Sequence, residues 1–128
     1  MEHQAKKVIS TFFTAVQQGD MQQVGALVHP DIEWSQPGNN RFSGLKQSAA
    51  EVFQMVGGMF AATDNTLTLT EVKVISENGN SVACLIRWKA GEMLDVENID
   101  VYTVMDGKIT KAVIYSADTE QEDRFWGK

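Results

Sequence analysis

The chain has a single cysteine among its 128 residues, so it cannot form an internal disulfide. This is typical of a protein that stays in a reducing compartment. The N-terminus also lacks the apolar core of an export signal, and we expect a cytoplasmic protein. Cys84 lies in the apolar strand pattern VACLIRW with no histidine near it in the sequence, which favours a packed thiol over a nucleophile.

Long apolar runs and clusters of basic residues are missing as well. No run of about eighteen apolar residues is present, so we expect no membrane span. Acidic residues outnumber basic ones by 17 to 11, which disfavours nucleic acid and anionic membranes as partners. The two histidines and the cysteine have no metal-ligand spacing, and no glycine-rich loop follows a strand. We therefore expect neither a metal nor a cofactor.

The apolar periodicity of the first half of the chain is helical. The length allows one domain, residues 1–128, with one core. Apolar residues recur at helical spacing over 2–18, in the segment after Asp20, and over about 45–60. Asp20 is followed three residues later by Gln23, as in a capping box, and a nearby proline is expected to end the second helix at residue 30. The sequence predicts three N-terminal helices.

The period changes from 3.6 to 2 in the second half, which predicts strands. A short strand is expected at DIEW, and four more at 66–76, 81–91, 96–105 and 108–117. Asn78-Gly79 and Asp106-Gly107 suit two-residue turns, so the pairing is antiparallel. Helices followed by antiparallel strands predict an α+β fold.

The last hairpin is expected to have two apolar faces. Its turn sets Met105 opposite Lys108, and regular pairing then sets Asp100 opposite Val113. One face would carry Asn98, Asp100, Tyr102, Val104, Ile109, Val113 and Tyr115, and the other Glu97, Ile99, Val101, Met105, Ala112 and Ile114. Three helices can cover only one face. We therefore expect the face with Ile99 and Val101 to pair with a second copy in a homodimer.

Three segments resemble the SnoaL-like and ketosteroid-isomerase-like branch of the NTF2-like superfamily. They are FFTAVQQGDMQQVGALVHPDIEW, FSGLKQSAAEVF and IDVYTVMDGKITKAVIY, they occur in the family's order, and the resemblance covers nearly the whole chain. It implies a cone in which three N-terminal helices pack on a curved, mainly antiparallel sheet and enclose a mostly apolar pocket. It also implies a small hydrophobic carbonyl or hydroxyl compound as the ligand.

The resemblance implies roles for particular residues. Asp100 matches the isomerases' pocket aspartic acid, which stays protonated and donates a hydrogen bond to the substrate oxygen. Phe12 stands where the isomerases have a donor tyrosine, and Ser35 stands where they have the base, so the chain is not expected to be a true ketosteroid isomerase. Glu33 is two residues from Ser35 and is one substitute base. Asp118 is the other, one residue beyond the acidic position of SnoaL-like cyclases.

Asp100 also has a surface interpretation. By alternation alone it points outward and pairs with Arg87 on the neighbouring strand; the resemblance instead places it in the pocket. The residues expected to line the pocket around it are Phe12, Val16, Trp34, Ser35, Phe53, Met59, Trp88, Asn98, Tyr102, Val113 and Tyr115.

The sequence leaves three functions open. The first is a cofactor-free enzyme of isomerase, cyclase or hydratase type, with Asp100 as the acid and Glu33 or Asp118 as the base. The second is a ligand-binding protein without chemistry, and the third is a dimeric assembly module with a filled pocket. A buried carboxyl of raised pKa beside a second polar group favours the enzyme. A pocket without a second titrating group favours the binding protein.

Overall fold

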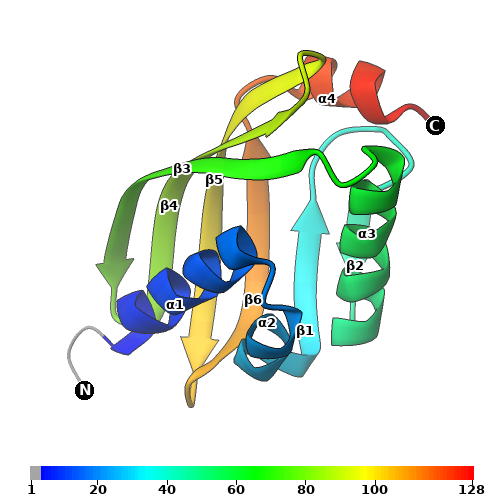
Figure 1. Cartoon of the computed structure of the whole chain (residues 1–128). Helices are drawn as coiled ribbons and strands as arrows, with labels where there is room; N and C mark the ends of the chain where they lie inside the picture. Colours follow the sequence, from blue (N-terminus) through cyan, green and yellow to red (C-terminus); the bar gives the residue numbers. More distant parts are fainter. Residues whose placement is uncertain (1–3) are drawn as a thin grey trace.

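The computed structural model describes residues 4–128, which form a curved six-stranded sheet and four helices (Figure 1). The elements are α1 (Gln4–Gln18), α2 (Met21–Leu27), β1 (Val28–Gln36), β2 (Gly44–Lys46), α3 (Ala49–Ala62), β3 (Leu67–Asn78), β4 (Ser81–Ala90), β5 (Leu94–Met105), β6 (Lys108–Ser116) and α4 (Thr119–Trp126). The strand order is β2-β1-β6-β5-β4-β3, and only β1 and β6 pair in parallel. The expected α+β fold is confirmed. Residues 2 and 3 of the first predicted helix lie outside the described part of the chain.

The core lies between the concave face of the sheet and the three N-terminal helices. Helix α1 crosses strands β3 to β6, and α3 packs against β1 and β2 (Figure 1). The apolar stripe of α1 explains this, because Ile9, Phe12 and Phe13 are all buried. Gly19 then ends the helix with φ 70°, a conformation that a glycine adopts without strain. Within residues 4–128, no helix has the length and apolar character that crossing a membrane requires.

The predicted boundary between the second helix and the first strand is wrong. Helix α2 starts as expected, since the Asp20 side chain accepts from the Gln23 N–H at 3.1 Å, but it ends at Leu27. Pro30 lies inside β1, where the pairing with β6 is interrupted between Val28 and Glu33, so no ladder bond is lost there. Strand β2 was not predicted.

Helix α3 starts four residues later than expected, at a capping box missed in the sequence. The Ser48 side chain accepts from the Glu51 N–H at 3.1 Å, and the Glu51 carboxylate accepts from the Gln47 N–H at 2.8 Å. The amide of Glu51 in the first turn and the amide of Gln47 just before the helix thereby have partners, which stabilises the start of α3.

The first hairpin turn is shifted by one residue. Asn78 pairs with Ser81, so the turn residues are Gly79 and Asn80 rather than Asn78 and Gly79. The second turn is as predicted, with Asp106 at φ 51° and Gly107 at φ 76°.

A bulge changes the register of the last hairpin. Met105 pairs with Lys108 as predicted, but the pairing shifts after Val104, and Thr103 lies opposite Lys111. Asp100 therefore lies opposite Ile114 and not Val113. One extra residue exchanges the two faces of all that follows on that strand. Ala112 and Ile114 are buried on the concave side, so their predicted place in an outer interface is wrong.

The convex face of the sheet carries an apolar band. Ile99 lies between Leu85 and Tyr115 in the cross-strand register, and Val101 lies between Ala83 and Val113. No described helix covers the band, and Tyr115 is 55% exposed. At one end of it, Arg87 pairs with Asp95 at 2.7 Å and with Glu71 at 3.3 Å. The convex face is therefore apolar as predicted, but Val113 and Tyr115 take the places expected for Ala112 and Ile114.

The C-terminal helix α4 was not predicted. Its aromatic residues Phe125 and Trp126 pack on the chain's own core. Trp126 is buried edge-to-face against Phe42, with ring centroids 5.2 Å apart. The Asp123 carboxylate accepts from the Asn39 N–H at 2.8 Å and from Asn40 Nδ2 at 2.9 Å. These contacts tie α4, which is red in Figure 1, to the loop after β1.

Candidate functional site

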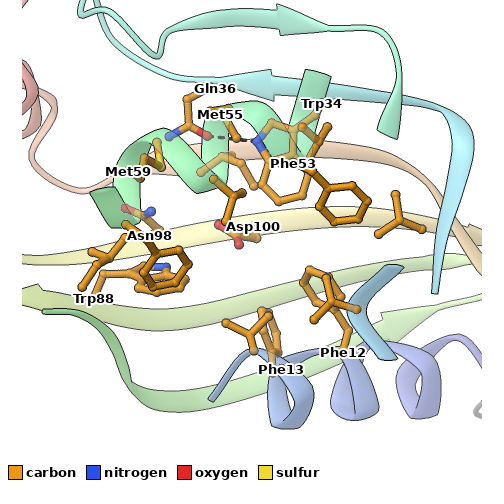
Figure 2. A pocket seen from close by; sticks show the side chains of 18 of the residues that line it. Phe12, Phe13, Trp34, Gln36, Phe53, Met55, Met59, Trp88, Asn98 and Asp100 are labelled. Atoms are coloured by element: carbon orange, nitrogen blue, oxygen red, sulfur yellow. Dashed lines mark hydrogen bonds between the residues drawn. The ribbon is translucent and has the colours of Figure 1, made fainter. Parts of the chain in front are cut away.

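A cavity of about 110 Å³ opens between the concave sheet face and the helices. A single water needs roughly 10–15 Å³ on the same measure, so the space admits a small organic molecule. Phe12 and Phe13 point into it from α1, with Trp34 and Phe53 on the opposite side of Asp100 (Figure 2). The lining is mainly apolar, which suits a hydrophobic ligand.

The cavity contains most of the residues predicted to line it. Those found there are Phe12, Val16, Trp34, Phe53, Met59, Trp88, Asn98, Asp100 and Tyr102. Ser35, Val113 and Tyr115 do not line it, so their predicted place is wrong. The β6 bulge moves Val113 and Tyr115 to the convex face. On β1, alternation turns Trp34 and Gln36 inward and Ser35 outward.

Asp100 faces the cavity and is 3% exposed. Its Oδ2 accepts a hydrogen bond from the Tyr102 hydroxyl at 2.6 Å, and its Oδ1 has no partner among the described residues. Burial raises the pKa of this carboxyl from its usual 3.8 to about 7; the Tyr102 bond opposes the rise and the charge of Glu122 adds to it. The surface interpretation is wrong, because Arg87 pairs with Asp95 and Glu71 on the convex side.

Tyr102 holds the Asp100 carboxyl in position. Its ring packs edge-on against Phe12 and Phe13, with centroids 5.9 Å apart in both pairs, and against Trp34 at 6.2 Å. Burial, and then the nearby Asp100 charge, raise the pKa of the Tyr102 phenol well above its usual value. The hydroxyl therefore keeps its proton at neutral pH and donates it in the hydrogen bond to Asp100.

Glu122 is a second carboxyl in the cavity, and the sequence analysis missed it. It projects from α4 and is 6% exposed. Burial raises its pKa, with Ser116 and the Trp126 indole opposing part of the rise, and its Oε2 has no hydrogen-bond partner in the described structure. A signal was present in the sequence. Glu122 lies four residues before Trp126, so a helix here places both on one face.

Neither predicted base lies in the cavity. Glu33 is exposed on the outward side of β1, opposite Lys111. Asp118 is the N-cap of α4, where its carboxylate accepts from the Gln121 N–H at 3.0 Å and from Gln121 Nε2 at 3.1 Å. These bonds lower the pKa of Asp118. Gln36 was also missed; its Oε1 accepts from Trp34 Nε1 at 2.9 Å at the cavity wall (Figure 2).

Cys84 lies beside Asp100, on the neighbouring strand β4, and does not line the cavity. It pairs with Asp100 across β4 and β5 and is buried. Burial, and then the Asp100 charge, raise the pKa of the thiol to about 12, which keeps it protonated and unreactive. Among residues 4–128, no group of three or more histidine, cysteine or acidic side chains is arranged to hold a metal ion.

Known proteins are similar to this chain in sequence or in fold. Residues 9–112 match the SnoaL-like domain family. An uncharacterised protein of Mycobacterium tuberculosis is 30% identical over 117 residues, which is 89% of each chain. The crystal structure of a protein of unknown function with a cystatin-like fold from Xanthomonas campestris is 32% identical, with a TM-score of 0.91 over 97% of this chain and 98% of that one. TerC, co-crystallised with polyporic acid, is 16% identical, with a TM-score of 0.82 over 97% of this chain and 99% of that one.

The buried Asp100 predicts a pH dependence of stability. A carboxyl whose pKa is 3.8 in the unfolded chain and about 7 in the folded protein destabilises the fold as the pH rises above 3.8. The loss in the free energy of unfolding reaches roughly 4 kcal/mol once the pH exceeds 7. Asp100→Asn removes this penalty. The stability of the variant relative to the parent should therefore increase by roughly that amount between about pH 4 and about pH 8, measured by urea unfolding.

Asp95→Asn is the matched control, on the same strand but on the convex face. Arg87 lowers the pKa of Asp95, so this variant should lose stability relative to the parent as pH rises. Equal pH profiles for Asp100→Asn and the parent would show that Asp100 is not a buried titrating group.

Proposed function

The chain belongs to the SnoaL-like domain family, and on that premise we propose that it binds a small, largely apolar carbonyl or hydroxyl compound and catalyses proton transfer on it. The observation that carries the proposal is Asp100, a buried carboxyl with one unpaired oxygen in an apolar cavity. Its pKa of about 7 lets it give and take a proton at neutral pH. A solved protein of the same fold, TerC, has been co-crystallised with polyporic acid, which supports a small organic ligand.

The cavity supplies both partners of a proton transfer. Protonated Asp100 donates its proton to the carbonyl oxygen of the ligand, while ionised Glu122 takes a proton from the adjacent carbon, and the enol forms. In the reverse transfers the enol O–H returns its proton to Asp100, and Glu122 returns its proton to either face of the same carbon. Both carboxyls line the same cavity, and a second titrating group beside Asp100 favours an enzyme over a passive binding protein.

Steroid isomerisation is not the proposed reaction. Phe12 lines the cavity where the isomerases have a donor tyrosine, and a phenyl ring donates no hydrogen bond. The loss of one such donor slows a reaction by a factor on the order of 10² to 10³. The Tyr102 hydroxyl does not replace it, because it already donates to Asp100.

Proton transfer can be measured on a probe ketone. β-Tetralone is flat and apolar, and the hydrogens beside its carbonyl exchange with deuterated water. We expect the parent to accelerate that exchange, followed by NMR, with a rate that depends on a group of pKa near 7. Asp100→Asn should abolish the acceleration, whereas Glu33→Gln should keep it, because Glu33 is exposed outside the cavity. Binding of β-tetralone without accelerated exchange would favour the second candidate, a ligand-binding protein.

The convex face supports a homodimer as a further part of the proposal. Its apolar band around Ile99, Val101 and Tyr115 has no cover within the described chain, and such a band on a sheet is a suitable self-complementary interface. A cytoplasmic location remains a prediction from the lone cysteine.

Val101→Glu should split the dimer, because it places a charge in the middle of the band without disturbing the concave core. Met93→Glu is the control, since Met93 is an exposed apolar side chain in the β4–β5 turn, outside the band. Sedimentation at micromolar concentration should show dimers for the parent and the control and monomers for Val101→Glu. A monomeric parent would contradict the proposal.

A further inference from the structure

Four buried polar atoms at the cavity have no hydrogen-bond partner among the described residues. They are Asn98 Oδ1, Asp100 Oδ1, Glu122 Oε2 and Trp126 Nε1, and all four residues line the cavity. The Trp126 indole lies close enough to the Glu122 carboxyl to lower its pKa, but the two do not meet in hydrogen-bond geometry. Buried polar groups in folded proteins are nearly always paired. Four exceptions around one cavity point to a ligand that supplies the missing partners.

The four atoms come from two elements. Asn98 and Asp100 are alternate residues of β5 and share its concave face. Glu122 and Trp126 are one helical turn apart on α4. Helix α4 packs against β5, and both carboxyls line the same cavity. A ligand that pairs with both must bridge the sheet and the C-terminal helix.

The kinds of atom left unpaired restrict the chemistry of the ligand. Three of the four are oxygens, which accept hydrogen bonds unless a carboxyl is protonated, and the Trp126 indole N–H is a donor. A ketone or an ether accepts hydrogen bonds only, so it can pair with Trp126 or with protonated Asp100, but it leaves the Asn98 oxygen and an ionised Glu122 without partners. A hydroxyl group both donates and accepts. It can donate to a carboxyl oxygen and accept from the indole at the same time.

The remaining lining restricts the body of the ligand. Phe12, Phe13, Trp34, Phe53 and Trp88 place aromatic rings around the space, which suits a flat ring system. A free water could pair with some of the polar atoms, but the cavity is several times larger than one water needs.

We propose that the natural ligand is an aromatic compound with a free hydroxyl group, held between β5 and α4: the hydroxyl donates to Glu122 and accepts from protonated Asp100. The proposal rests on the ligand-binding function proposed above and specifies its ligand class. Burial raises the pKa of both carboxyls, which favours a neutral hydroxyl over an ammonium group as their partner.

Matched probes test the hydroxyl directly. Titration calorimetry compares naphthol, its methyl ether and naphthylmethylamine, which share one ring system and differ in the polar group. Naphthol should bind at least about tenfold more tightly than the ether, because the ether has no proton to donate to Glu122 or to the Asn98 oxygen. Equal affinities for naphthol and the ether would overturn the hydroxyl proposal and leave the cavity's binding function standing. Tighter binding of the amine would overturn it in favour of a cation. If no probe bound, both proposals would fail.

A pair of variants on α4 locates the effect. Glu122→Leu removes the carboxyl acceptor and should reduce the preference for naphthol over its ether several-fold. Glu120→Leu changes an exposed acid on the same helix, paired only with Arg124 at the surface, and should keep the preference of the parent. If Glu122→Leu does not fold by circular dichroism, Asn98→Leu on β5 provides the same test. An unchanged preference in a folded variant of either residue would contradict the bridging role.

Discussion

The carboxyl of Asp100 is buried in an apolar cavity with one hydrogen bond, from Tyr102, and one unpaired oxygen. An ionised carboxylate in such a place is costly, and no basic side chain among residues 4–128 is a cause of its pKa shift. Arg87 is bound to acids on the other side of the sheet. The group is therefore balanced between its two protonation states near neutral pH. Each proposed property of the site depends on that balance.

The rest of the structure maintains this environment. Phe12 and Phe13 from α1 and Trp34 from β1 fix the Tyr102 ring, which in turn fixes one oxygen of Asp100. Helix α4 closes the polar end with Glu122 and Trp126, and it is held there by the contacts of Asp123 with the loop after β1. The same helix that completes the cavity thus contributes its second carboxyl. Loss of α4 would expose Asp100 to water and return its pKa towards the usual value.

The fold class and the position of Asp100 could be predicted from the sequence, but for different reasons. Periodicity alone predicted helices and strands; the inward direction of Asp100 came from the family resemblance, because both faces of β5 are apolar. The bulge after Val104 has no sequence signal as clear as a turn, and it reversed the predicted direction of Val113 and Tyr115. Glu122 was missed because its burial depends on the docking of α4, a tertiary contact that the sequence left open. Glu33 was predicted from its distance to Ser35, and Asp118 from the acidic position of SnoaL-like cyclases. Strand alternation turns Glu33 outward, and Asp118 caps helix α4.

The most direct test of this account is a titration of the Asp100 side-chain carboxyl carbon by NMR, with the signal assigned by its loss in Asp100→Asn. The account predicts a midpoint near 7, because the carboxyl is desolvated and only partly stabilised by Tyr102. Full occupancy of the cavity by a hydroxylated ligand should shift that midpoint, since the ligand pairs with the free oxygen. A midpoint of about 4 or below, the value for a solvated aspartate, would contradict the account and remove the acid on which the proposed function rests.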